Sequence, residues 1–166
     1  MSNPSQFAGW YKAANFAYGS PGGPSALFLQ QSAPTLATSP VTALPATTAF
    51  GYTTTSDGIT FYPLNTNAPI QVGGDSNAEE VTPTTVAAPQ PGYQQVTFTA
   101  EFENDHGSGD AVASATFGAQ EAANYAATQG GGIVVVDAEW TRLGGTTGIY
   151  NALTLPSGVT KLDHRP

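Results

Sequence analysis

The sequence feature that most constrains this chain is a helix pattern followed at once by a buried strand. Alanines recur at helical spacing over residues 119–127, so one face of the expected helix is smooth and can lie close to a sheet. Gly130, Gly131 and Gly132 then end the helix, because glycine adopts the left-handed C-cap conformation without a Cβ penalty. The run from Ile133 to Val136 is β-branched throughout, which is typical of a strand covered on both faces. We therefore expect one short helix, at about 117–129, to organise a fold made mainly of strands.

Composition excludes several classes of partner. At 166 residues the chain fits one domain with a sizeable core. Only 10% of its residues are charged and the net charge is −8, so we expect neither nucleic acid nor an anionic membrane as a partner, since both require basic patches. No cysteine is present, which excludes disulfides and thiolate metal sites. We expect no signal peptide and no membrane helix, because no basic and apolar leader and no long apolar run is present.

Beyond residue 47 the pattern predicts strands separated by turns. Residues 47–62 form an expected hairpin around a Ser-Asp-Gly turn, and residues 93–103 alternate apolar and polar side chains as an amphipathic strand does. Pro83 interrupts an expected strand at 80–86 and so places that strand at a sheet edge. Shorter strands are expected at 70–72, 111–115 and 159–162. The predicted fold is mainly β, with a β-sandwich or jelly-roll-like body and the one short α-helix.

Residues 1–46 differ from this body. Six of the 13 prolines lie there, and Lys12 is the only charged residue of the segment. Proline at this density argues against regular helix and against central strands. The aromatic and aliphatic side chains of the same segment are nonetheless costly to leave in water, by roughly 25 cal/mol per Å² of apolar surface. Two interpretations remain: an extended arm that wraps its own domain at 47–166, or an arm that lies on neighbouring subunits. We favour the second.

The arm interpretation predicts a set of partner-binding residues. They are aromatic or aliphatic: Phe7, Trp10, Tyr11, Phe16, Tyr18, Leu27 and Phe28. Trp10, Tyr11 and Phe28 are the expected anchors, because large aromatic side chains dominate the energy of many interfaces. The negative charge of the chain would keep free subunits soluble and apart until they dock.

The segment 101–110 is the best candidate for a ligand site. Glu101, Glu103, Asp105 and Asp110 supply hard oxygen ligands of the kind that Ca²⁺ takes. Their order does not match the helix–loop–helix calcium motif, and the two glutamates fall on the outer face of the expected strand. We therefore expect a solvated acidic turn and no metal site.

Catalytic residue types occur without a catalytic pattern. His106, Ser108 and Asp110 are neighbours in sequence, but a Gly-Ser-Gly loop does not hold a triad rigidly and the chain has no G-x-S-x-G elbow. His106 and His164 lack the spacing of a zinc site. The Gly130–Gly132 run follows the C-terminus of a helix, whereas phosphate binds at N-termini. We therefore predict no catalytic residue and no cofactor, and we expect the protein not to be an enzyme.

Two resemblances follow from these residues. The segment AQEAANYAATQGGGIVVVD resembles the entry to right-handed β-helix proteins, including phage tailspikes and polysaccharide lyases. Only 29 residues follow Asp137, too few for stacked coils, so we do not extend the β-helix to this chain. The charge-poor proline-rich arm, the acidic turn-rich body and the absence of cysteine are similar to structural proteins of tailed-bacteriophage virions, of the capsid decoration or cement type.

The second resemblance implies a non-enzymatic structural protein that decorates or cements a phage capsid through subunit–subunit contacts. Its partners would be the major capsid protein or other virion proteins, and the chain would form a homo-oligomer, for which a trimer is favoured. It would be made in the host cytoplasm and reside in the virion. The first alternative is a phage fibre, receptor-binding or carbohydrate-binding module, whose aromatic side chains would stack on sugar rings. The second alternative is a polysaccharide-active enzyme.

Overall fold

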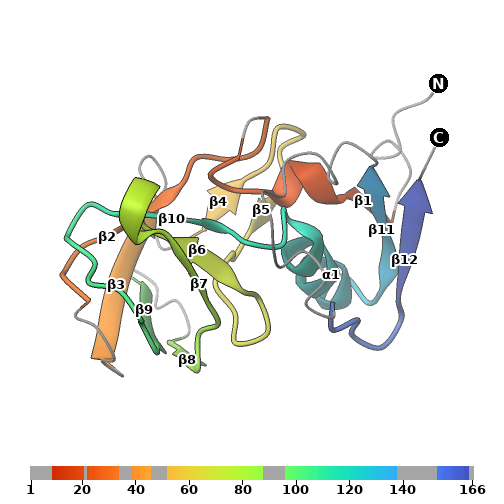
Figure 1. The fold of residues 1–166 in the computed structure, drawn as a ribbon. Coiled ribbons are helices and arrows are strands. Elements are labelled where there is room, and N and C mark those ends of the chain that lie inside the picture. The colour runs from red at the N-terminus through yellow and green to blue at the C-terminus, as the bar shows by residue number, and fades with distance from the viewer. Residues whose placement is uncertain are drawn as a thin grey trace.

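The computed structural model describes residues 9–20, 22–33, 39–45, 52–87, 96–137 and 153–164 (Figure 1). Strands predominate in these ranges, and α1 (Ala119–Thr128) is their single α-helix. The mainly-β prediction and the short helix at about 117–129 are confirmed. The more specific sandwich or jelly-roll arrangement stays a prediction.

The strands lie in three sheets. The largest contains β2 (Leu27–Leu29), β3 (Ser39–Pro45), β6 (Ile70–Val72), β7 (Glu79–Val81), β8 (Thr85–Val86), β9 (Val96–Ala100) and β10 (Ala111–Ser114). It is antiparallel, with the order β7-β6-β10-β2-β3-β9-β8. The second is parallel and contains β1 (Trp10–Lys12), β11 (Gly132–Asp137) and β12 (Val159–His164), with β11 in the centre. The third is the predicted hairpin, β4 (Thr53–Thr54) with β5 (Thr60–Phe61).

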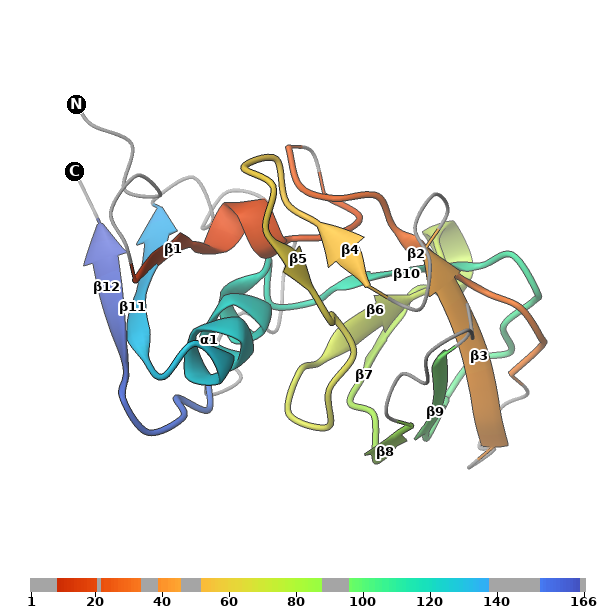
Figure 2. The same cartoon turned by 180° about the vertical axis from the view of Figure 1, so that it is seen from behind.

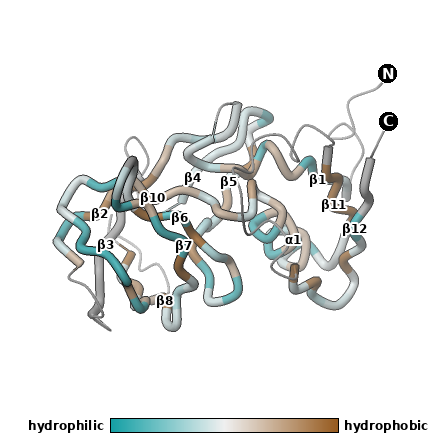
Figure 3. Tube along the Cα trace, in the orientation of Figure 1, coloured by the Kyte–Doolittle hydropathy of each residue, from teal (hydrophilic) through white to brown (hydrophobic). Residues whose placement is uncertain are grey.

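Two lobes result. We call the part built on the seven-stranded sheet the antiparallel lobe. The part built on the parallel sheet, α1 and the 3₁₀ turn η2 (Ala13–Phe16) is the helical lobe. Figures 1 and 2 show the lobes side by side, with the β4–β5 hairpin between them. Each lobe has a core of its own, and the strands at these cores carry the hydrophobic segments of Figure 3, as β6 and β11 show.

The antiparallel sheet is rolled, because a very short connection joins its two edges. β7 and β8 lie at opposite edges of the sheet, yet only residues 82–84 separate them. Four residue steps span at most about 14 Å. A flat sheet of seven strands would place its edges about 29 Å apart, at about 4.8 Å per strand. The sheet must therefore curl around the core formed by alternate residues of its strands, such as Leu27 and Leu29 of β2. Pro83, buried at the corner, divides the edge strand that the sequence predicts at 80–86 into β7 and β8.

The helical lobe follows the sequence pattern closely. Ala119, Ala122, Ala123 and Ala126 are almost completely buried, as the predicted stripe requires. The helix ends in a Schellman motif, in which the N–H groups of residues 130 and 131 donate to the carbonyls of residues 127 and 126 at 3.1 and 2.9 Å. β11 then lies between two parallel neighbours. Its Val134 and Val135 point to opposite faces of the sheet and are both almost completely buried, in agreement with the expected strand covered on both faces.

The expected separation of an arm at 1–46 from a domain at 47–166 is wrong for the described residues. β1 pairs in parallel with β11, and β2 lies between β10 and β3 in the centre of the antiparallel sheet. The segment thus supplies strands to both lobes. Its large apolar side chains explain this outcome, because residues that are costly to expose are buried most economically in the chain's own core.

The expectation that prolines exclude central strands from this segment is also wrong. β3 is central, although it contains Pro40 and Pro45. β3 pairs with β9 over 39–43 and with β2 over 43–45, so each proline has a strand partner on one side only. A missing N–H is tolerated where no neighbouring strand needs it. The offset of the two partner strands therefore accommodates both prolines.

At the start of α1, Gly118 lies against the backbone of the N-terminal segment. Gly118 has φ +82°, and a Cβ built there would lie 2.1 Å from the carbonyl oxygen of Ala13 and 2.6 Å from the carbonyl carbon of Phe16. The backbone of η2 therefore touches the N-cap of the helix directly. Only glycine permits both the left-handed φ and this close approach.

A pair of substitutions separates these two requirements. Gly130→Ala, at φ +89° with nothing within 4 Å, should lose about 1–2 kcal/mol of unfolding free energy through backbone strain alone. Gly118→Ala should lose at least about 3 kcal/mol, because overpacking against η2 adds to the strain. Chemical denaturation of both variants gives the comparison. Equal losses in the two variants would contradict the close approach of η2 to α1.

Candidate functional site

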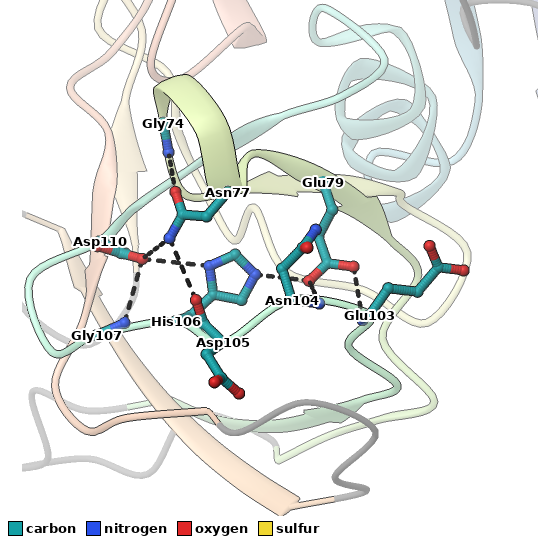
Figure 4. Close-up of polar contacts among 9 residues, drawn as sticks. All are labelled: Gly74, Asn77, Glu79, Glu103, Asn104, Asp105, His106, Gly107 and Asp110. Carbon is teal, nitrogen blue, oxygen red and sulfur yellow. Dashed lines mark hydrogen bonds and ion pairs between the residues drawn. The ribbon is translucent and has the colours of Figure 1, made fainter.

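The most organised polar group in the described residues surrounds His106 (Figure 4). The imidazole side chain is fully buried and lies between two carboxylates. Its Nε2 is 2.6 Å from Oε1 of Glu79, and its Nδ1 is 3.2 Å from Oδ2 of Asp110. We call His106, Glu79, Asp110 and the nearby Asn77 the His106 cluster.

Backbone contacts place the histidine ring in this position. The main chains of His106 and Ala33 form a β-bridge. The N–H of His106 donates to the carbonyl of Ala33 at 2.9 Å, and the N–H of Ala33 donates to the carbonyl of His106 at 3.0 Å. The ring also packs edge-on against Phe102, with centroids 5.4 Å apart. At Gly73, a Cβ would lie 3.0 Å from the Cε1 atom of the imidazole, so the glycine leaves room for the ring. Backbone hydrogen bonds and packing therefore fix the position of the ring independently of the hydrogen bonds that its nitrogens make.

Both carboxylates have further donors. Glu79, the first residue of β7, accepts the N–H groups of Glu103 and Asn104 at 2.8 and 3.0 Å. Asp110 accepts the N–H of Gly107 at 3.2 Å. These bonds attach the β7 edge to the loop that follows β9.

Asn77 completes the cluster from the 3₁₀ turn η3 (Asp75–Asn77). Its Nδ2 donates to Oδ2 of Asp110 at 3.0 Å and to the carbonyl of Asp105 at 3.2 Å. The N–H of Gly74 in turn donates to Oδ1 of Asn77 at 3.2 Å. The amide therefore holds η3 against the same loop.

These contacts control the ionisation of the two acids. Burial alone would raise the pKa of Glu79, but the N–H groups of Glu103 and Asn104, followed by the His106 ring, outweigh it and hold the pKa below its ordinary value. Burial likewise opposes ionisation of Asp110, but bonds from His106, Asn77 and the N–H of Gly107 lower the pKa of that carboxyl. Both acids are therefore carboxylates near neutral pH.

A histidine between two carboxylates donates to both only when both ring nitrogens carry a proton. A neutral ring would direct a lone pair at one of the two anions. Each ring nitrogen thus lies against one carboxylate, and His106 contributes to the lowered pKa of both Glu79 and Asp110. Chemically, the arrangement is an ionic connection between chain segments, and neither nitrogen is available to take a proton from a substrate.

The sequence grouping of His106, Ser108 and Asp110 is only partly brought together. Asp110 does contact the ring, but the Ser108 hydroxyl donates to the carbonyl of Gln30 at 3.2 Å. Nε2, the nitrogen a serine nucleophile would use, is occupied by Glu79. Sequence reasoning missed Glu79 and Asn77, because they lie 27 and more positions from His106 and no local motif links them.

The acidic residues considered for calcium do not converge. Glu101, Glu103 and Asp105 are exposed, and Figure 4 shows the side chains of Glu103 and Asp105 directed away from the cluster. Within the described ranges, no group of three acidic or histidine side chains is placed to hold a metal ion. Asp110 contributes its side chain to the buried network, whereas Glu103 and Asp105 contribute only main-chain groups in the bonds described above.

The predicted partner-binding residues have different positions. Phe16, Tyr18 and Leu27 are completely buried in the two cores, so their assignment as partner contacts is wrong for this fold. The physical reason is the integration of their segment into both sheets.

Four predicted contacts remain to be placed. Tyr11 is half-buried and packs edge-on against Tyr125, with centroids 5.3 Å apart. Trp10 and Phe28 are half-buried and lie outside both core clusters. Phe7 lies outside the described residues. Trp10 and Phe28 therefore retain part of their side-chain surface accessible, whereas the three buried residues do not.

Replacement of the histidine measures the strength of the ionic connection. His106→Phe keeps an aromatic ring against Phe102 but removes both donors, so two carboxylates lose their counter-charge. We expect a loss of about 2–4 kcal/mol of unfolding free energy by chemical denaturation. Ser108→Ala in the exposed part of the same loop is the control and should change it by less than about 0.5 kcal/mol. Similar values for both variants would argue against an ionic connection.

Acid should weaken the cluster. The folded-state pKa values of Glu79 and Asp110 lie below their ordinary values of 4.5 and 3.8, so their stabilisation is present above those values and is lost as the pH falls through the lower folded-state values. Unfolding free energy should therefore decline below about pH 4.5, and the decline should be shallower in Glu79→Gln. Glu80→Gln, at an exposed position of β7, is the matched control. The same slope in Glu79→Gln and wild type would be the contrary result.

Comparisons with known proteins do not assign this arrangement to a family. No protein-family model matches the chain, and neither a curated protein sequence nor a solved structure matches it. Among the described residues, no helix combines the length and the hydropathy that crossing a membrane requires. The function is therefore inferred from the chain's own residues.

Proposed function

We propose that the protein is a non-enzymatic structural component of a tailed-phage virion, which decorates or cements the capsid through subunit contacts. The observation that carries the non-enzymatic part of the proposal is the position of His106 between two carboxylates. This side chain is buried, both of its nitrogens are held by carboxylates, and its bonds connect chain segments. A histidine in that role serves stability. The low content of charged residues and the acidic, turn-rich body support the virion assignment.

In this proposal, the protein contacts the capsid through residues on one face of its parallel sheet, and a separate N-terminal arm is not needed. Tyr11, Val134 and Val136 pack in the core with α1. Side chains alternate along a strand, so Trp10 and Ile133, which are paired in register, lie on the opposite face of the parallel sheet. Both are half-buried there, beside Val135, which is buried on the same face, so the accessible part of that face lies around Trp10 and Ile133. Large aromatic side chains in such positions supply much of the energy of many interfaces.

The partners proposed are the major capsid protein or other virion proteins, with the chain itself as a homo-oligomer, a trimer being favoured. Contacts repeated over a lattice add weak affinities, so each single contact need not be large. A net charge of −8 keeps unassembled subunits apart in the host cytoplasm. The assembled protein would reside in the virion.

Copurification tests the proposal. The chain should be detected by mass spectrometry in gradient-purified particles, and the purified protein should cosediment with capsids that lack it. Trp10→Ala should weaken cosedimentation at least about tenfold, the usual effect of truncating an interface anchor, at a temperature where the variant is folded by circular dichroism. Tyr52→Ala, which truncates an exposed aromatic outside the parallel sheet, is the control. Absence of the chain from particles, with no binding to capsids, would overturn the proposal.

A carbohydrate-binding module is the second candidate, and one observation favours it. Tyr52 is 37% exposed and packs against Tyr62, with ring centroids 5.5 Å apart. The Tyr62 hydroxyl donates to the carbonyl of Ala87 at 2.9 Å, which fixes that ring. Partly exposed rings of this kind stack on sugar faces. Glycan-array binding that Tyr52→Ala abolishes and Trp10→Ala leaves intact would select this candidate.

A further inference from the structure

Glu121 is a buried acid that takes no part in the His106 cluster. It lies in the first turn of α1, in the helical lobe, and only 1% of its surface is exposed. An ionised carboxyl loses its hydration in the interior, so acids are seldom buried to this degree without a partner of opposite charge. The groups around Glu121 therefore decide whether it is charged in the folded protein.

Hydroxyl groups from the connection between β10 and α1 surround this carboxyl. Oε2 of Glu121 accepts the hydroxyl of Thr116 at 2.7 Å. The oxygen of the same hydroxyl accepts the N–H of Gln120 at 3.2 Å. The hydroxyl oxygen of Ser114 accepts the N–H of Gly118 at 2.8 Å. Glu121 therefore belongs to the set of contacts that satisfies the first N–H groups of the helix.

The hydrogen bond from Thr116 does not require a charge on Glu121. A carboxylate oxygen accepts it, and the carbonyl oxygen of a protonated carboxyl accepts it as well. Both states of the acid therefore preserve the contacts at the start of α1. The difference between the two states is the penalty of a negative charge in the interior.

The elements packed against α1 bring the following described titratable side chains: Tyr11 and Lys12 in β1, Lys161 in β12, and Tyr18 after η2. Tyr11 packs on α1, so Lys12, its neighbour along the strand, points to the opposite face of the sheet. Lys161 is exposed on the edge strand. Burial, followed by the charge of Glu121, raises the pKa of Tyr18. That phenol is therefore neutral near pH 7 and supplies no counter-charge.

Burial accordingly dominates the ionisation of Glu121. It raises the pKa of this carboxyl from 4.5 to about 7, against the opposing effect of hydrogen bonds from Thr116, its own N–H and Ser114. Glu79 in the antiparallel lobe has the opposite balance, because N–H groups and the His106 ring hold its pKa below the ordinary value. Each lobe thus buries an acid, and the two acids respond to pH in opposite senses.

We propose that Glu121 makes the helical lobe pH-responsive: ionisation of its carboxyl, as the pH rises through neutrality, reduces the stability of the start of α1 and of η2, which lies against it. The direction follows from proton binding. Between pH 4.5 and about 7, the folded chain keeps a proton that the unfolded chain has released. The stabilisation is therefore fully present below pH 4.5 and is lost as the pH rises through about 7. The His106 cluster is weakened only by stronger acid.

Glu121→Gln tests the proposal, because glutamine keeps an oxygen acceptor for Thr116 and does not ionise. In the wild-type protein, hydrogen-exchange protection of the α1 and η2 amides, corrected for the intrinsic effect of pH, should fall at least about tenfold from pH 5 to pH 8, the effect of one pKa unit. The fall should be smaller in β9 of the other lobe. Histidines also titrate in this range, so the difference between wild type and Glu121→Gln gives the share of Glu121.

In Glu121→Gln the α1 and η2 amides should change by less than about threefold over the same range, half of one pKa unit. Glu80→Gln, at an exposed position of β7, is the matched control and should behave as wild type does. The same fall in Glu121→Gln as in wild type, or an equal fall in β9 and α1, would contradict the proposal.

Direct titration of the wild-type protein decides the matter even where the variant fails to fold. The ¹³C chemical shift of the Glu121 carboxyl, followed by NMR, should have its midpoint near pH 7. A midpoint within about one unit of the ordinary value of 4.5 would overturn the proposal, because the carboxyl would then be ionised throughout the neutral range.

Discussion

The antiparallel lobe depends on one constraint, the three-residue connection that joins the two edges of its sheet. Residues 82–84 bring β7 to β8, and the sheet must roll to allow it. The His106 cluster draws the same parts together by different means. Glu79 stands on β7, and the N–H groups it accepts follow β9, the partner of β8. The short connection and the ionic contacts of the His106 cluster therefore both hold the two edges of the rolled sheet together, and the buried charges lie where these edges meet.

The N-terminal segment gains its structure from what it must hide. Phe16 enters the core beneath α1, whereas Tyr18 and Leu27 enter the core of the rolled sheet. Aromatic side chains are costly to leave in water, and those of the segment are distributed between the two interiors as a result. The N-terminal segment, which the sequence pattern separates from the body, thereby joins the two lobes.

Sequence reasoning succeeded where the signal is local and periodic. The alanine stripe of α1, the glycine stop and the β-branched run of β11 each follow from spacing within a few residues, and the structure confirms them. It failed where placement depends on distant partners. Whether Pro40 is tolerated depends on where β2 and β9 end, and the surroundings of His106 depend on Glu79, 27 residues away. Neither fact has a local signature. The described aromatic residues of the first 46 positions are buried or half-buried, as their apolar character predicts, but composition alone does not say which surface covers them.

The pairing of β1 with β11 joins Trp10 to Ile133, so the helical lobe is assembled from two distant parts of the chain. The whole antiparallel lobe is inserted between them. During synthesis, the strands from β2 to β10 leave the ribosome before α1 and β11, so the inserted lobe can mature first. β1 and η2 must wait for their partners until about four fifths of the chain has been made, with their apolar side chains uncovered in the meantime. This order makes the helical lobe the late step of folding, and the nascent chain is most vulnerable to aggregation before β11 arrives.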